Sequence, residues 1–272
     1  MRVVKAHALG NDFLLIHEDE LAAGIDRPAL ARRLCDRHRG IGADGVIAFR
    51  ETSPAGDAQS RTDAGATMAL LNADGSYSEL SGNGVRCLAA QLARAHDCRP
   101  GASIHIDTDA GGKRLELLAA DGARFTFRAD MGHPEAIAQQ RLEVDGTAVT
   151  VVTLRVGNPQ CVVLGDVTEA RLHSVAAKLA VHPAFPQGTN VELAEVEAPD
   201  RVRILIWERG AGPTQASGTG ACAAAVAAMR FGGAARDVAV TAPGGTQRVE
   251  WRPDGLFLTG WAEVVFDARW LA

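Results

Sequence analysis

Two short segments of the chain combine residue types that could bind an anion. One reads Ser-Gly-Asn-Gly at residues 81–84 and the other reads Ser-Gly-Thr-Gly at residues 217–220, and an alanine-rich apolar stretch follows each. Glycines before a helix let the backbone approach a ligand, and the first N–H groups of a helix lack partners within it. The helix dipole adds partial positive charge at the same end. Each segment is therefore a candidate site for a carboxylate.

The same two segments form the clearest internal repeat. Their serines, Ser81 and Ser217, lie 136 residues apart, which is half the chain length. A second, weaker repeat consists of Gly-Asn-Asp at 10–12 and Gly-Asn-Pro at 157–159. The repeats predict two similar halves related by an approximate two-fold axis, with both serine segments at a shared cleft. The alternative for each serine is simple helix capping, because serine is a preferred N-cap residue.

Two helix N-termini that grip one carboxylate would place Ser81 and Ser217 beside the neighbouring carbon. In an α-amino acid this carbon carries the α-hydrogen. Two groups on opposite sides could remove that hydrogen from one face and return it on the other. The carbanion charge would delocalise into the carboxylate, where the helix dipoles stabilise it. The arrangement predicts a racemase or an epimerase that needs no cofactor.

The remaining pattern predicts an α+β fold that is rich in strands. We expect helices at residues 27–38, 83–96, 168–179 and 219–231. The second and fourth are apolar almost all round, which is typical of helices buried on every side. We expect strands at residues 3–5, 13–17, 45–49, 68–71, 103–107, 114–118, 124–128, 149–154, 161–164, 191–196, 202–207, 237–240, 247–251 and 262–266.

These elements predict two pseudo-symmetric domains, each a barrel-like sheet wrapped around one apolar helix. A turn sequence near residues 118–122 suggests the boundary. The N-terminal domain is expected to take residues 1–118 and 262–272, and the C-terminal domain residues 119–261.

Composition excludes several classes of partner. The formal net charge is -5 and no long run of like charges occurs, so no nucleic-acid surface is expected. No apolar run reaches about 18 residues and no signal-like N-terminus is present, which favours a cytoplasmic protein without a membrane span. The five scattered cysteines do not form a CxxC pair, and no HExxH, P-loop or strand–GxGxxG–helix unit occurs. We therefore expect neither a disulfide framework nor a metal or cofactor site.

Six further segments occur in the order found in diaminopimelate epimerases, and jointly the chain resembles that family from end to end. The segments are GNDF at 10–13, DRHRGIGADG at 36–45, NADGS at 72–76, GNP at 157–159, TNVE at 189–192 and ERGAG at 208–212. The resemblance implies cofactor-independent interconversion of LL- and meso-2,6-diaminopimelate. It also implies a small amino-acid substrate and a homodimer.

The resemblance further implies roles for individual residues. Side chains that would hold polar groups of the substrate are Asn11, Asn72, Asn158, Asn190 and Arg209. Backbone N–H groups that would hold the reacting carboxylate belong to Gly82, Asn83, Gly218 and Thr219. Glu208 would serve both substrate binding and the second base. Taken without the resemblance, the asparagines also fit turn positions, and Glu208 with Arg209 fits a surface ion pair.

The chain departs from the family at three positions. Serine stands at 81 and 217 where the family has its catalytic cysteines, and Gln160 stands where a histidine is usual. A thiol has a reference pKa near ~8.5, whereas a serine hydroxyl is a far weaker acid that needs an adjacent base. Glu208 could assist Ser217, and Ser81 has no evident equivalent. The sequence therefore predicts a protein that binds diaminopimelate and epimerises it poorly.

Two alternatives remain open from the sequence. One is a non-catalytic diaminopimelate-binding relative, which the two serines favour. The other is a diverged isomerase or dehydratase of the kind related to proline racemase or to phenazine biosynthesis. The asparagine set and the Glu208–Arg209 pair, which suit a second amino-acid end, argue against that second alternative.

Overall fold

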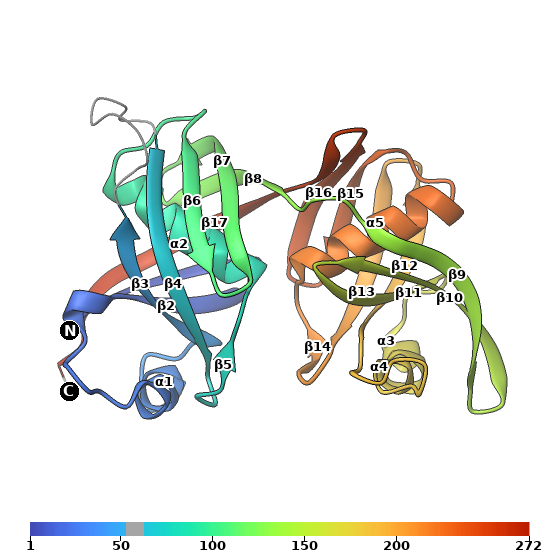
Figure 1. Ribbon diagram of the computed structural model, residues 1–272, viewed down its shortest axis with the longest axis horizontal. Coiled ribbons are helices and arrows are strands. Elements are labelled where there is room, and N and C mark those ends of the chain that lie inside the picture. Colours follow the sequence, from blue (N-terminus) through green and yellow to red (C-terminus); the bar gives the residue numbers. More distant parts are fainter. Residues whose placement is uncertain (53–62, 272) are drawn as a thin grey trace. The chain divides into compact units, whose positions relative to one another are not determined.

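The computed structural model describes residues 1–52 and 63–271 and divides into two compact units (Figure 1). Unit 1 contains Met1–Ala129 and Gly260–Ala272, and unit 2 contains Asp130–Thr259. Each unit combines a curved sheet with one long helix, so the predicted α+β class is confirmed. Strand β17 (Gly255–Arg269) contributes its first residues to unit 2 and the rest to unit 1.

In unit 1 the sheet closes on itself. Its strands in spatial order are β17, β1 (Arg2–Ala8), β2 (Asn11–His17), β3 (Gly45–Thr52), β4 (Asp63–Asn72), β6 (Ser103–Thr108), β7 (Gly111–Asp121) and β8 (Arg124–Asp130). Strand β8 pairs with β17 again, which completes the barrel. The short strand β5 (Tyr77–Ser78) pairs with β4 outside this circuit.

Unit 2 repeats the same strand order, although no pairing between β9 and β17 closes it among the described residues. Its strands in order are β9 (Glu135–Val144), β10 (Thr147–Val156), β11 (Asn158–Leu164), β12 (Asn190–Ala198), β13 (Arg201–Glu208), β15 (Asp237–Ala242), β16 (Gly245–Arg252) and β17. Parallel pairing occurs at β2–β3 and β4–β6 in unit 1 and at β11–β12 and β13–β15 in unit 2. The short strand β14 (Gly212–Thr214) corresponds to β5. The repeat seen in the sequence is thus also a repeat of strand pairing.

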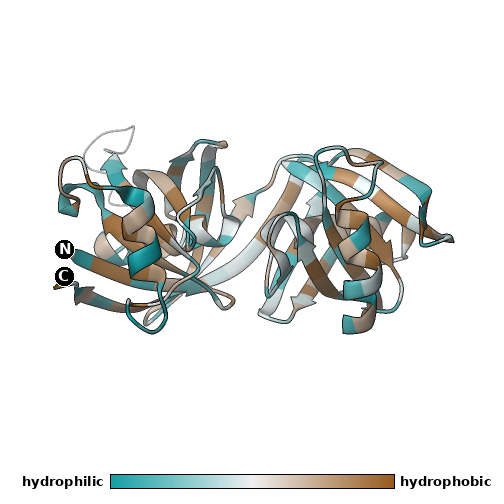
Figure 2. Cartoon of the chain, turned by 90° about the horizontal axis from the view of Figure 1, so that it is seen from below, coloured by the Kyte–Doolittle hydropathy of each residue, from teal (hydrophilic) through white to brown (hydrophobic). Residues whose placement is uncertain are grey.

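The long helix of each unit lies in the hydrophobic core. Helix α2 (Gly82–Ala95) packs among the unit 1 strands, and helix α5 (Gly218–Phe231) packs among the unit 2 strands. Residues 221–228 of α5 are each at most 1% exposed, and six of the eight are alanine. Such small side chains let the strands approach the helix closely. Figure 2 shows apolar stretches on the strands and helices of each unit.

The two other expected helices differ from the prediction. Helix α1 (Arg27–Cys35) ends before residue 38 because Asp36 leaves helical geometry, and its Oδ1 accepts the N–H groups of His38 and Arg39, each at 2.8 Å. The segment expected as one helix at 168–179 is divided into α3 (Glu169–Arg171), a π-helical turn η2 (Leu172–Ala176) and α4 (Ala177–Ala180). A 3₁₀ turn, η1 (Glu18–Glu20), was not expected.

Every strand expected from the sequence lies within an observed strand, but three strands were missed. Strand β9 is polar and mostly exposed, so it lacks the apolar alternation that identifies a strand, and β5 and β14 are too short to show such alternation.

The turn near residues 118–122 joins β7 to β8, which pair with each other, and the contacts divide the chain after Ala129. No helix in the described ranges is long and apolar enough to span a membrane.

Candidate functional site

Ser81 stands at the N-terminus of α2 and caps its first turn. Its backbone is extended, and its Oγ accepts a hydrogen bond from the backbone N–H of Gly84 at 3.1 Å. A Cβ placed on Gly82 would meet no atom within 4 Å, so the main chain there is open to an approaching ligand. The capping bond uses an Oγ lone pair and leaves the hydroxyl hydrogen free to be donated.

Ser217 occupies the same place at the N-terminus of α5. Its Oγ accepts the backbone N–H of Gly220 at 3.2 Å, and its own backbone is also extended. Ser217 is only 5% exposed, whereas Ser81 is half-buried. Gly218 is more confined than Gly82, because a Cβ there would lie 3.1 Å from Leu258 Cδ2. Thr219 follows in the first turn and is half-buried.

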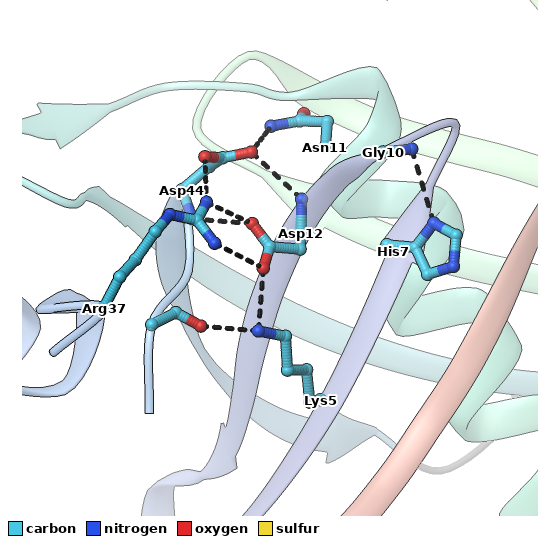
Figure 3. A network of polar contacts seen from close by, with 8 residues as sticks. Lys5, His7, Gly10, Asn11, Asp12, Arg37 and Asp44 are labelled. Atoms are coloured by element: carbon cyan, nitrogen blue, oxygen red, sulfur yellow. Dashed lines mark hydrogen bonds and ion pairs between the residues drawn. The ribbon is translucent and has the colours of Figure 1, made fainter. Parts of the chain in front are cut away.

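Asn11 begins β2 and is hydrogen-bonded on both polar atoms of its side chain. Its Nδ2 donates to Asp44 Oδ2 at 2.8 Å (Figure 3), and its Oδ1 accepts from Asn83 Nδ2 at 3.1 Å. The buried Arg86 donates in turn to Asn83 Oδ1. The structure therefore brings together two expected site residues, Asn11 and Asn83, and fixes the orientation of the Asn11 amide.

A charged network lies beside Asn11, and the sequence analysis did not assign it a role (Figure 3). Arg37 Nη2 lies 2.9 Å from Asp12 Oδ1 and 2.8 Å from Asp44 Oδ1, while Lys5 Nζ lies 2.8 Å from Asp12 Oδ2. Burial alone would raise the pKa of Asp12, but hydrogen bonds from Arg37 and Lys5 outweigh burial and lower it. Asp12 is therefore ionised, and the network anchors the start of β2.

Asn72 lies at the end of β4, apart from this network. It is exposed, and its Nδ2 donates to Ser76 Oγ at 2.9 Å. In the described part of the chain its side chain bonds within its own turn rather than to Asn11 or Asn83.

In unit 2 each of the two expected asparagines is hydrogen-bonded to a nearby residue. Asn158 begins β11 as Asn11 begins β2, and its Oδ1 accepts from Gln160 Nε2 at 2.6 Å. Gln160 is 1% exposed, and its Oε1 has no hydrogen-bond partner among the described residues. Asn190 Oδ1 accepts the backbone N–H of Arg209 at 2.9 Å, and the exposed Arg209 donates from Nη1 to the Gln187 carbonyl at 2.9 Å.

Glu208, the last residue of β13, supplies a carboxyl next to Ser217. Burial raises the pKa of Glu208, and the hydroxyls of Ser217 and Thr214 lower it again in part, so that its pKa stays above the ordinary value. A carboxyl with a raised pKa beside a hydroxyl is a candidate general base.

Unit 2 holds a second buried carboxyl that was not among the predicted site residues. Glu192 on β12 is 0% exposed, and burial together with the neighbouring Glu208 raises its pKa well above the ordinary range. The sequence signal was available, because a glutamate interrupts the apolar run at 191–194.

Comparison with solved structures identifies the fold class. A predicted epimerase from Pseudomonas aeruginosa has a TM-score of 0.71 at 16% identity, with 100% of this chain and 99% of that chain covered. A hydroxyproline epimerase from Agrobacterium vitis, solved with bound trans-4-hydroxy-L-proline, has a TM-score of 0.66 at 15% identity, with 98% and 90% covered. The chain thus shares the fold of these two epimerase structures.

Sequence comparison then identifies the family. The family model described as diaminopimelate epimerase matches residues 3–137 and 152–265. The diaminopimelate epimerase of Desulforudis audaxviator is 40% identical, with 100% of this chain and 99% of that protein covered, and that of Heliobacterium modesticaldum is 39% identical, with 98% of each covered. The chain belongs to the diaminopimelate epimerase family, which is a family of isomerases, and the resemblance stated from the sequence is confirmed.

Proposed function

We propose that this chain binds 2,6-diaminopimelate and is built for its cofactor-independent, two-base epimerisation between the LL and meso forms. The observation that carries the proposal is the equivalence of Ser81 and Ser217. Both stand at the N-cap of the core helix of their unit, and both Oγ atoms accept the N–H of the residue three positions later. One proton-transfer group would come from each unit, with the helix N–H groups holding the reacting carboxylate.

The binding part of the proposal is supported by ordered side chains. Asn11 and Asn190 have their amide orientation fixed by neighbouring hydrogen bonds, at 2.8 Å to Asp44 and 2.9 Å from the Arg209 backbone. Preoriented groups lose less freedom when a ligand binds. We expect them, with Asn72, Asn158 and Arg209, to receive the polar groups of the substrate.

The catalytic part is expected to be weak. A serine hydroxyl releases its proton far less readily than a thiol, and a positioned acid or base contributes about 10²–10⁴-fold to a rate. Ser217 has the Glu208 carboxyl beside it, whereas in unit 1 the position equivalent to Glu208 holds Asn72. We therefore expect Ser81 to be the weaker of the two groups.

Calorimetry and isotope exchange test the two parts separately. Diaminopimelate should bind with a measurable heat, and proline and lysine should bind much more weakly because neither carries two amino-acid ends. In deuterated water at neutral pH the α-hydrogen of bound diaminopimelate should exchange very slowly. Tight binding of proline would contradict the proposed substrate, and rapid exchange would contradict the proposed loss of catalysis.

A non-catalytic binding protein is the second candidate. It is favoured because both serine Oγ atoms are engaged as helix caps. Restoring cysteine at both positions separates the two candidates, since only an epimerase scaffold would gain turnover. Both candidates are proposed to act in the cytoplasm as a homodimer, and sedimentation would test the dimer.

A further inference from the structure

Glu192 is a buried carboxyl to which the described part of the chain supplies no hydrogen-bond donor and no cation. It lies on β12 between β11 and β13, it is 0% exposed, and neither of its oxygens has a hydrogen-bond partner among the described residues. An isolated ionised carboxylate in such a place is strongly disfavoured, so the group takes up a proton instead. Even a neutral carboxylic acid costs stability there, which points to a role outside packing.

Its side chain is directed at the N-terminus of α5. Glu192 and Ala194 lie two residues apart on β12 and therefore face the same side of the sheet, and Ala194 belongs to the same core cluster as α5. A Cβ placed on Gly220 would lie 2.6 Å from Glu192 Oε1 and 3.2 Å from Ser217 Oγ. The carboxyl of Glu192 and the hydroxyl of Ser217 therefore approach the same point on the first turn of the helix.

Glu192 and Glu208 lie on the same face of the β12–β13 pair. Glu192 pairs with Ile206, and Glu208 stands two residues further along β13, so the two carboxyls are diagonal neighbours. Such positions lie within reach of long side chains. Glu208 in turn lies beside Ser217, whose hydroxyl lowers the pKa of the Glu208 carboxyl. Glu192, Glu208 and Ser217 thus form a contiguous group inside unit 2.

Unit 1 shows that the fold itself does not need this carboxyl. Ile47 pairs with Leu15 and with Leu70, as Glu192 pairs with Val162 and Ile206 in the equivalent strands. A Cβ on Gly84 would meet Ile47 Cδ1 at 3.0 Å, in the way that one on Gly220 meets Glu192. An aliphatic side chain therefore fills the same place in the other unit.

We propose that Glu192 is a positioning residue for the second proton-transfer group. It is a neutral acid that turns its hydrogen toward Glu208 and keeps Glu208 ionised as the acceptor for the Ser217 proton. This role rests on the function proposed above. When Ser217 Oγ takes the α-hydrogen as a proton, the C–H electron pair stays on the substrate and the former hydroxyl proton of Ser217 moves to Glu208. The reverse transfers restore both groups.

The electrostatics support this order of protonation. Burial, and then the charge of Glu208, raise the pKa of Glu192 above that of an ordinary glutamate, whereas the hydroxyl of Ser217 partly offsets the effect of burial on the pKa of Glu208. Cys161 on β11 also interacts with Glu192, and burial raises the pKa of its thiol, so it remains uncharged. Glu208 is the group expected to lose its proton first.

Carbon-13 NMR titration of the glutamate carboxyls in the full chain without substrate tests the proposal. The Glu208 signal, assigned with Glu208→Gln, should titrate at lower pH than that of Glu192. Glu192→Gln, which keeps a neutral hydrogen-bond donor, should leave the Glu208 midpoint within about half a pH unit. Glu192→Ile, which copies the unit 1 residue, should raise that midpoint by about one unit because the donor is lost. Ile47→Val is the matched control and should not move it.

Two results would overturn the proposal. An unchanged Glu208 midpoint in Glu192→Ile would show that Glu192 only fills space. A clear fall of the midpoint in Glu192→Gln would show that Glu192 carries the charge, and this variant decides alone if Glu192→Ile does not fold. Because no substrate is present, either result is distinct from a failure to bind diaminopimelate, which calorimetry detects.

Discussion

Unit 1 and unit 2 place a serine at the same point before the core helix, but different side chains surround the two serines. Beside Ser217 the strands carry two carboxyls, Glu192 and Glu208. The equivalent positions in unit 1 hold Ile47 and Asn72. Since both units form the same strand order around their helices, the carboxyls are not required by the fold. The difference is chemical, and it gives Ser217 a potential proton acceptor that Ser81 lacks.

In unit 1 the carboxylates near the site are paired with cations. Asp12 and Asp44 lie within 3 Å of the guanidinium of Arg37, and Asp12 also pairs with Lys5 at 2.8 Å. Both carboxylates are thus paired with a cation, whereas no such cation is paired with Glu192 or Glu208 in the described part of unit 2. Compensated networks hold a backbone in place, while burial without a cation raises the pKa of a carboxyl and makes it a candidate for proton transfer.

The largest expected effect comes from restoring the thiols. Ser81→Cys combined with Ser217→Cys should raise epimerisation of diaminopimelate by at least about 10²–10⁴-fold, because each position regains a group that ionises near neutral pH. Of the two single changes, Ser81→Cys should recover more turnover. In that variant the remaining serine is Ser217, which has the Glu208 carboxyl beside it. Initial rates of LL to meso conversion provide the measurement.

Two outcomes would contradict the expected difference between Ser81 and Ser217. Equal recovery by the two single changes would mean that the unit 2 carboxyls do not assist Ser217. No recovery in the double variant, with binding intact, would favour the non-catalytic binding protein.

The next largest effect concerns Glu208 itself. In the protein carrying both restored cysteines, Glu208→Gln should lower turnover by about 10²-fold, because the neutral amide cannot accept a proton. Glu195→Gln is the matched control on the neighbouring strand, since Glu195 pairs with Arg203 and should leave turnover unchanged. Equal losses in both variants would point to a general disturbance of the strands rather than to proton transfer.

The repeated part of the fold could be predicted from the sequence, for a physical reason. The two core helices are apolar on all sides, and strand runs with β-branched residues alternate with turns, so burial alone determines both patterns. Strand β9 could not be found in this way because its residues are mostly exposed. Helix α1 ends early because the side chain of Asp36 bonds to the following backbone, which apolar spacing does not report.

The candidate site was predictable only in part. Asn11 and Asn83 are found hydrogen-bonded to each other, although they are 72 residues apart in the sequence. The role of Glu192 was not predictable, because its significance depends on the absence of any partner in the folded unit and on its approach to Gly220. A single sequence shows that a carboxyl interrupts an apolar strand, but it does not show which residues this side chain faces in the folded unit.

The two units should also differ in how pH affects their stability. Glu192 keeps its proton to higher pH in the folded chain than in the unfolded chain, so its contribution to stability falls as pH rises above about 4.5. Asp12 has a lowered pKa, so its contribution is present at neutral pH and is lost as pH falls toward and below about 4.

Urea unfolding at several pH values would measure this difference. Asp12→Asn should cost on the order of 1–3 kcal/mol at pH 7 and less at pH 3. Glu192→Gln should become less costly, or stabilising, between pH 5 and pH 8. Parallel pH dependence of the two variants would contradict the assigned protonation states.

The smallest effect tests how closely Glu192 approaches the helix. Gly84→Ala and Gly220→Ala add the same methyl group to equivalent turns and gain the same helix propensity. The new methyl at 84 meets the movable end of Ile47 at 3.0 Å, whereas that at 220 meets the enclosed Glu192 Oε1 at 2.6 Å. Gly220→Ala should therefore be less stable than Gly84→Ala by on the order of 1 kcal/mol in chemical unfolding. Combining Gly220→Ala with Glu192→Ala should remove that difference, because the obstructing carboxyl is gone. If the two alanine variants are equally stable, Glu192 does not pack against the first turn of α5, and its link to Ser217 must run through Glu208 alone.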